Sequence, residues 1–180
     1  MKTIAVIVAV SIIAIVAFSL AGSFIQDSGQ GGGAVSSSMD AFSYTISGAV
    51  ARPGTYVLRG AAVLQDLLEA AEGATSNADP LAYNVDYVLK SKGSYYIAPI
   101  YDNSNTCAVT PIQKVNINKA PEEDLVSIAG FGKAAASSLC AYRLSNSFAA
   151  IEEIKNVSGI GDATFRSVRD KITLKDGAAS

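Results

Sequence analysis

The apolar positions of the chain follow different patterns in its N-terminal, central and C-terminal parts. Residues 4–21 form a continuous apolar run without a charged side chain. Apolar and polar residues then alternate in short segments, which predicts strands over 42–46, 55–58, 87–89 and 95–97. Apolar residues at helical spacing predict a helix over 62–71 and, in the C-terminal part, further helices over 122–129, 133–144, 151–157 and 162–172.

The N-terminal apolar run is long enough to cross a membrane, because about 20 helical residues span roughly 30 Å of hydrocarbon. Lys2 precedes the run and the next basic residue is Arg52, which favours a cytoplasmic N-terminus with the rest of the chain outside. We therefore expect residues 1–25 to anchor the protein in the cell membrane by a single pass. A cleaved signal peptide is the alternative, since Ser19-Leu20-Ala21 offers small residues at suitable offsets.

Composition shifts divide the rest of the chain. Residues 26–41 are rich in Gly and Ser, as flexible tethers are. Residues 42–100 hold two expected hairpins around one helix, which indicates a small domain of β-grasp type. Residues 101–113 read as a linker, and residues 114–175 as an all-α domain. The expected fold class is therefore α+β.

A duplicated turn is the most informative motif of the C-terminal domain. Ala129-Gly130-Phe131-Gly132 recurs as Ser158-Gly159-Ile160-Gly161, and a helical pattern follows each copy. Glycines at the start of a helix expose backbone N–H groups, which bind phosphate with help from the helix dipole. Two such turns suggest a clamp on a phosphate backbone. The alternative is that the glycines only close tight turns between packed helices.

Charged residues near the two turns differ between the copies. Lys133 follows the first turn and can add charge to a phosphate contact, whereas Asp162 occupies the matching place in the second. Arg166 and Arg169 lie one and two turns further on and can compensate. The expected DNA-binding residues are Gly130, Phe131, Gly132, Lys133, Ala134, Gly159, Ile160, Gly161, Arg166 and Arg169. Such contacts carry no base information, so binding should be independent of sequence.

Overall composition narrows the candidate chemistry. The net charge is −2, and residues 113 onward carry nine Lys or Arg against eight Asp or Glu, a weak footprint for a DNA binder. The chain has no His and shows no clustered metal carboxylates, so we expect no catalytic residue, metal or cofactor. Its two cysteines, Cys107 and Cys140, could pair outside the membrane. We favour a buried free thiol at Cys140.

The central segment resembles an SLBB domain, a β-grasp ligand-binding module of secreted and exported proteins. The resemblance rests on Ile46-Ser47-Gly48-Ala49-Val50, on Arg52-Pro53-Gly54-Thr55-Tyr56 and on Tyr96-Ile97-Ala98-Pro99. It implies a ligand for this domain without indicating which one.

The C-terminal segment resembles a tandem helix-hairpin-helix domain. Its first residues, from Lys114 to Ala120, and both Gly-x-Gly turns are similar to those of the bacterial competence DNA receptor (ComEA) family. The order of anchor, SLBB domain and tandem hairpins is similar to the long form of that family. The resemblance implies a receptor for double-stranded DNA in natural transformation. It also implies an uptake channel and pilus-type machinery as partners, and allows self-association on DNA.

Two other functions stay open at this stage. The near-neutral charge and the SLBB resemblance also suit an envelope scaffold that binds a polysaccharide or a protein. A surface nuclease is the other, but the sequence has no His and no clustered metal carboxylates, which general-base and two-metal chemistry require.

Overall fold

The computed structural model describes residues 40–102 and 110–177, which belong to one compact unit of the chain. The expected anchor, almost all of the expected tether, and Cys107 lie outside the described residues. Among residues 40–102 and 110–177, no helix is both long and apolar enough to cross a membrane. The prediction of an N-terminal anchor therefore stays a prediction.

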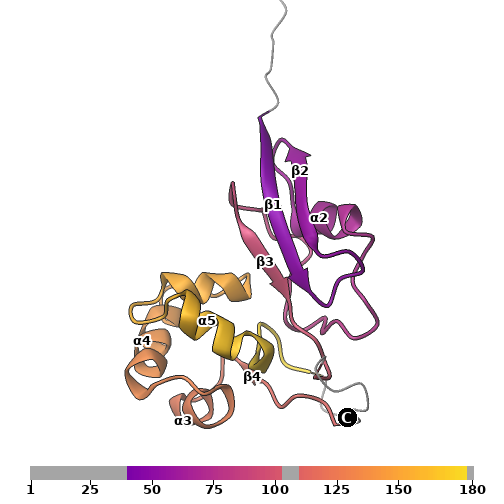
Figure 1. The fold of residues 1–180 in the computed structure, drawn as a ribbon. Coiled ribbons are helices and arrows are strands. Elements are labelled where there is room, and N and C mark those ends of the chain that lie inside the picture. The colour runs from indigo at the N-terminus through magenta and orange to yellow at the C-terminus, as the bar shows by residue number, and fades with distance from the viewer. Residues whose placement is uncertain (1–39, 103–109, 178–180) are drawn as a thin grey trace, which may run out of the picture. The chain divides into compact units, whose positions relative to one another are not determined.

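A three-stranded sheet forms the first half of the described chain. Strands β1 (Ala41–Gly48) and β2 (Gly54–Arg59) pair antiparallel, with Thr45 opposite Thr55, as the expected first hairpin requires. Strand β3 (Ser94–Ile97) pairs parallel to β1, so the order is β2-β1-β3 (Figure 1). Helix α2 (Leu64–Ala70) packs against the sheet and confirms the expected helix. Tyr44, Ile46, Leu67 and Ile97 fill the core between them.

The expected second hairpin is wrong. Residues 87–89 do not form a strand beside β3. Their backbone instead bonds to the start of α2, where Leu64 N–H donates to the Tyr87 carbonyl and Leu89 N–H donates to the Ala62 carbonyl. A strand parallel to β1 needs a connection of a dozen or more residues, and residues 49–93, which include β2 and α2, supply it. The alternating Tyr87-Val88-Leu89 pattern therefore marks part of this connection.

The second half of the described chain is helical and closed at its ends by two short strands. Its helical elements are α3 (Glu122–Asp124), the π-helical turn η1 (Leu125–Ala129), α4 (Lys133–Arg143), the 3-10 helix η2 (Ile151–Asn156), α5 (Asp162–Val168) and the 3-10 turn η3 (Arg169–Lys171). Strands β4 (Val115–Asn116) and β5 (Ile172–Thr173) pair in parallel. All four expected helices are thus present in position, with three of them replaced in part or whole by 3-10 or π geometry.

One core serves all of these helices. Leu125, Phe131, Leu139, Ile154 and Val168 are among its buried side chains. Cys140 is a free thiol that packs against this core, but it is only half-buried, so the expected fully buried position is not found.

The 3-10 helix η2 begins after Ala150, a residue whose side chain cannot cap a helix. Ala150 stands at the N-cap, where Ser, Thr, Asp or Asn is preferred. The Glu153 carboxylate reaches back instead, with Oε2 2.8 Å from the Ala149 nitrogen and 3.4 Å from the Ala150 nitrogen. This is half of a capping box, in which the residue at the third helical position accepts the free N–H groups. Ala150 is then free to be buried in the core.

Candidate nucleic-acid interface

The first hairpin joins η1 to α4 through the predicted Gly130-Phe131-Gly132 turn. The η1 turn ends at Gly130, whose φ of 84° and ψ of 27° are left-handed. The Leu125 carbonyl accepts hydrogen bonds from both the Gly130 and the Phe131 N–H groups. Helix α4 then begins at once, with Gly132 as its N-cap.

The second hairpin repeats this plan with a tighter turn. The Ile160 N–H donates to the Val157 carbonyl at 3.1 Å, and Gly159 between them has a φ of 85°. Gly161 is the N-cap of α5, as Gly132 is of α4. The two copies of the sequence motif therefore occupy equivalent places in the structure.

The two glycines of each turn have different reasons to be glycine. Gly130 and Gly159 adopt a positive φ, which costs other L-residues roughly 1–2 kcal/mol. Gly132 and Gly161 have φ values of −63° and −99°, which any residue can adopt. A Cβ built on either of these N-cap glycines would meet nothing within 4 Å. The described fold therefore gives no steric reason for glycine at 132 and 161, and close approach of an external group would supply one.

The backbone N–H groups that follow Gly132 are accessible. Gly132 has no side chain to cap the helix, and Lys133 and Ala134 are exposed at the first turn of α4. An 11-residue helix leaves its first N–H groups without partners inside the helix, and they carry partial positive charge. This end of α4 can donate hydrogen bonds to an anion.

The apolar residues between the glycines point away from this surface. Phe131 is 2% exposed and Ile160 is 3% exposed, and both belong to the helical core. Both were predicted among the DNA-binding residues. The structure places their side chains where they fix the turn, which leaves only their backbones near the hairpin surface.

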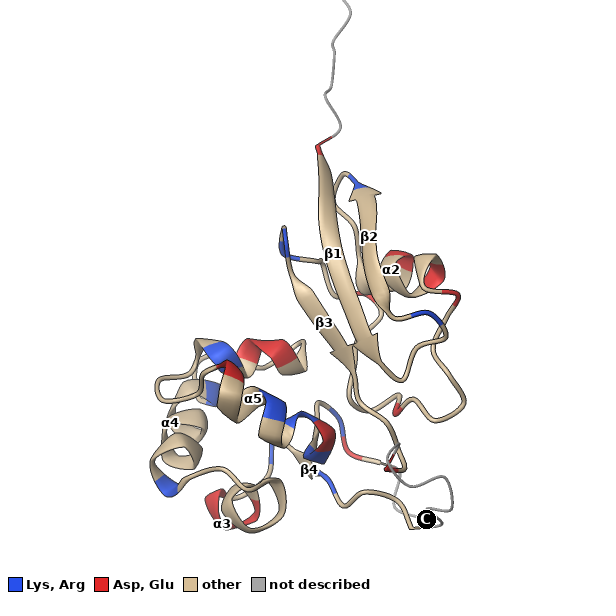
Figure 2. Ribbon diagram, in the orientation of Figure 1, with Lys and Arg blue, Asp and Glu red and all other residues tan. Residues whose placement is uncertain are grey.

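Charge is distributed unevenly around the two hairpins. Figure 2 shows α4 as mostly uncharged, and its only basic residues, Lys133 and Arg143, lie at its two ends. Lys133 lines a surface cavity of ≈ 520 Å³ together with Glu122, Glu123 and Val126. The first hairpin thus has one cation with two carboxylates nearby.

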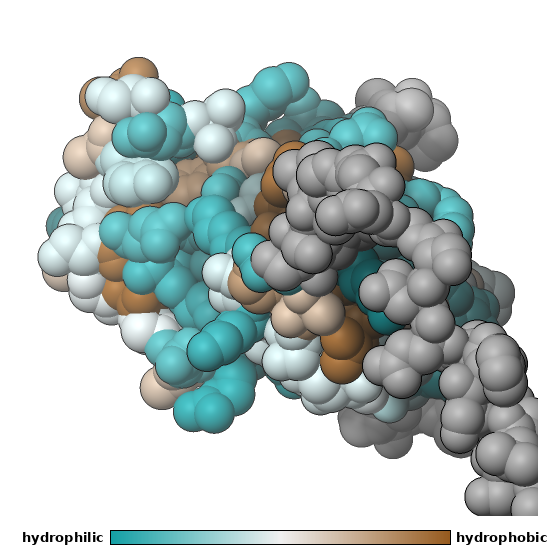
Figure 3. All heavy atoms as spheres, turned by 90° about the horizontal axis from the view of Figure 1, so that it is seen from above, coloured by the Kyte–Doolittle hydropathy of each residue, from teal (hydrophilic) through white to brown (hydrophobic). Residues whose placement is uncertain are grey.

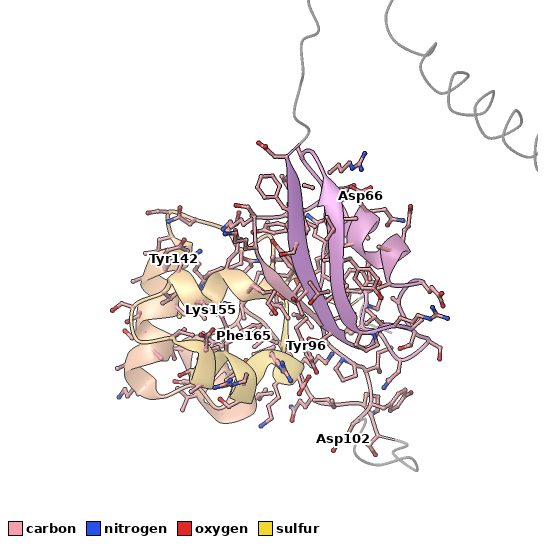
Figure 4. All side chains as sticks on the ribbon, turned by 45° about the horizontal axis from the view of Figure 1, so that its top comes forward. Asp66, Tyr96, Asp102, Tyr142, Lys155 and Phe165 are labelled. Carbon is pink, nitrogen blue, oxygen red and sulfur yellow. The ribbon has the colours of Figure 1, made fainter. Side chains whose placement is uncertain are left out.

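The second hairpin has a cation that the sequence analysis missed. Lys155 of η2 extends to Asp162 at the first position of α5, with Nζ 3.5 Å from Oδ1. The same ammonium lies 5.3 Å from the centre of the Phe165 ring (Figure 4 labels both residues). Lys155 therefore offsets the negative charge of Asp162. Only this contact across the turn shows that Lys155 lies near the second hairpin, because Lys155 belongs to the helix before the turn.

The two predicted arginines lie in different surroundings. Arg166 is exposed on α5 and free to reach solvent. Arg169 is half-buried, and its guanidinium carbon lies 3.7 Å from the centre of the Tyr96 ring on β3. The structure thus places Arg169 against the sheet and not with the hairpin residues.

Neutral polar groups flank the second hairpin. A surface groove of ≈ 450 Å³ beside its turn is lined by residues that include Ser138, Ser145, Asn146, Asn156 and Ser158. Hydroxyl and amide side chains are common donors to phosphate oxygens.

On the face shown in Figure 3, hydrophobic residues form separate patches between hydrophilic ones. Within the part of the chain that the structure describes, no group of His, Cys, Asp and Glu could hold a metal ion.

Two stretches of the chain match known families. Residues 43–86 match the SLBB domain, and residues 110–173 match the helix-hairpin-helix motif. Fold and hairpins together define a helix-hairpin-helix protein that also carries an SLBB domain. ComE operon protein 1 of Bacillus subtilis (strain 168) is 33% identical over 140 residues, which cover 72% of this chain and 68% of that protein. The chain belongs to the ComE operon protein 1 (ComEA) family.

Proposed function

We propose that this protein is a membrane-anchored extracellular receptor that binds double-stranded DNA without sequence specificity, for uptake in natural transformation. Membership of the ComEA family and the helix-hairpin-helix match support DNA binding. The observation that carries the proposal is the pair of N-cap glycines, Gly132 and Gly161. Each stands where the fold does not require glycine and where a phosphate can approach open backbone N–H groups.

The proposed contacts are chiefly to the DNA backbone. Backbone N–H groups of Lys133 and Ala134, with the Lys133 ammonium, form the contact at the first hairpin. The second hairpin contributes through Gly161, Lys155 and Arg166. Helix α5 is shorter than α4 and begins with Asp162, so we assign the stronger contact to the first hairpin. Neutral donors of the adjoining groove add hydrogen bonds that release no counterion.

Replacing Gly132 by Ser tests the proposal sharply. The hydroxyl oxygen of a serine at the N-cap accepts a hydrogen bond from a free N–H of α4, and serine is a preferred cap. The free energy of unfolding should therefore be unchanged or higher. The same hydroxyl and its Cβ occupy the space that a phosphate would take, so the affinity for duplex DNA should fall. Equal affinity in the folded variant would exclude the first hairpin as a phosphate site.

The matched control is Gly54→Ser on β2. It adds the same hydroxymethyl group, but at a glycine in the sheet whose built Cβ would make only ordinary contacts. DNA affinity is measured by mobility shift with random duplex at several salt concentrations. Binding should weaken with rising salt, because each phosphate contact releases counterions. Binding that ignores salt would contradict a backbone clamp.

Membrane anchoring and the uptake partners belong to the same proposal. The apolar run 4–21 supports an anchor, and the family supports transfer of bound DNA to a membrane-embedded channel with help from pilus-type machinery. Protease added to intact cells should remove the hairpin domain if it lies outside. A binding role without catalysis predicts that supercoiled DNA stays intact when incubated with the protein and Mg²⁺.

A further inference from the structure

Tyr96 makes three separate contacts from the three-stranded sheet to the hairpin half of the chain. Its N–H donates to Glu152 Oε1 of η2 at 2.6 Å. Its hydroxyl donates to Asp170 Oδ1 of η3 at 2.5 Å. Its ring lies under the Arg169 guanidinium at 3.7 Å, and Figure 4 labels the tyrosine among the surrounding side chains. We name Tyr96, Glu152, Arg169 and Asp170 the Tyr96 junction.

The backbone contact matters because β3 is an edge strand of the sheet. An edge strand presents N–H groups that need a partner, either water or another strand. Here the partner is a carboxylate from the other half of the chain. Because Glu152 is part-buried at this contact, its carboxylate in turn needs a donor. Separating the two halves would leave both groups to be satisfied by water.

Arg169 is committed to the same junction. The guanidinium lies close over the Tyr96 ring, a geometry that favours a cation–π contact. Its Nε is buried and, among the described residues, has no hydrogen-bond partner. The ring contact and the burial of Nε hold this side chain toward β3. Arg169 therefore differs from the exposed Arg166 in what it can contact.

Further polar contacts join the same two halves. Glu153 Oε1 accepts from the Tyr87 hydroxyl at 3.2 Å and from Lys90 Nζ at 3.3 Å. At another point, Lys114 Nζ lies 2.6 Å from Asp79 Oδ2, and both side chains are almost completely buried. One exposed ion pair would contribute little, but these contacts are several and partly shielded from water.

We propose that the three-stranded sheet holds the hairpins rigidly and that the Tyr96 junction fixes one orientation between them. Arg169 is then a positioning residue of this junction and not a DNA ligand. The link to DNA rests on the proposed function, whereas the rigid coupling does not. A partner that holds the sheet would then also set the direction in which the hairpins face DNA.

Nitrogen-15 relaxation on the full-length protein in detergent tests the coupling without DNA. Amides of β1 and β2 and amides of α4 and α5 should report one rotational correlation time in the natural chain. Tyr96→Ala should replace it by two different, shorter times while the chemical shifts within each half stay native. Tyr96→Ala removes the ring and hydroxyl contacts but keeps the backbone N–H, whereas Glu152→Ala removes the carboxylate that this N–H bonds to. Each variant should separate the two times, so the test stands even if one of them fails to fold.

Matched controls separate the junction from general effects. Tyr96→Phe removes only the hydroxyl contact to Asp170, and Tyr56→Phe removes a hydroxyl that bonds within the sheet half, to the Arg52 carbonyl. The first should loosen the coupling in part, and the second should leave it unchanged. Two correlation times in the natural chain, or one shared time in both alanine variants, would overturn the proposal.

The role of Arg169 is read from the salt dependence of DNA binding. Removing one phosphate contact should reduce the slope of log K against log salt by about 0.9. We expect that loss for Lys133→Ala and no change in slope for Arg169→Ala, which should instead separate the correlation times. A reduced slope for Arg169→Ala would make it a DNA ligand. Absence of any DNA binding would count against the proposed function and leave the relaxation result valid.

Discussion

Lys155 and Asp162 form an ion pair across the second hairpin, with Nζ 3.5 Å from Oδ1. The pair links the helix before the turn to the first residue of the helix after it. Asp162 would repel a phosphate at this end of α5, and Lys155 reduces that repulsion. The charges of Lys155 and Asp162 therefore nearly cancel at the second hairpin, whereas Lys133 at the first has Glu122 and Glu123 nearby.

Removing the negative charge of this pair should strengthen DNA binding. In Asp162→Asn the Lys155 ammonium loses its partner and becomes available to a phosphate. We expect higher affinity for random duplex and a salt slope steeper by about 0.9. Lys155→Ala should shift both quantities the other way. Asp86→Asn, an exposed change in the sheet half, is the control, and an equal effect there would show that only net charge matters.

The positive φ at the first glycine of each turn should appear as a stability difference. Gly130→Ala places a Cβ on a residue with a φ of 84°, and the cost is about 1–2 kcal/mol of backbone strain. Gly132→Ala involves no such strain because its φ is −63°. Urea unfolding of both variants measures the difference. Equal stabilities would mean that the turn relaxes to another conformation.

The protein should become less stable as the pH rises toward 7. Burial raises the pKa of Glu152 from its usual 4.5 to about 7, although the Tyr96 N–H, its own backbone N–H and Lys155 lower it. The folded state therefore holds this proton more tightly than the unfolded chain. Its contribution to stability is complete below pH 4.5 and is lost as the pH rises through about 7.

Unfolding in urea at several pH values from 5 upward, roughly the range in which few other side chains titrate, checks this. The chain has no histidine, which makes that range unusually clean. Glu152→Gln should remove most of the decline. A decline of the same size in that variant would assign it to other groups.

The buried pair of Lys114 and Asp79 should behave differently from an exposed one. Lys114→Met leaves the Asp79 carboxylate buried without its cation, which typically costs about 3–5 kcal/mol. In the double variant Lys114→Met and Asp79→Asn most of that loss should return, because no uncompensated charge remains. Additive losses, measured by urea unfolding, would show that the two side chains act independently.

The sequence predicted the helices of the C-terminal half well because their apolar spacing is strong and uninterrupted. The short strands β4 and β5 carry only two residues each, too few for a periodic pattern. Residues 87–89 show a strand pattern, but they belong to the connection that leads to β3. The local sequence pattern cannot tell a strand of the sheet from a connecting segment, since that depends on which distant segment its backbone pairs with.

The candidate site divides in the same way. The two glycine turns were found because each is a local feature of the sequence. The contact of Lys155 with Asp162 and that of Arg169 with Tyr96 could not be predicted, because they form across a turn and with a distant strand. Whether the predicted residues bind DNA stays a prediction that the experiments above address.

The parallel pairing of β4 with β5 brings Val115 opposite Ile172. The polypeptide thus enters and leaves the helical half at neighbouring points. A segment with adjacent ends can be transplanted into a surface loop of an unrelated host without stretching either protein. The two hairpins could in this way be inserted at a single site of a host loop.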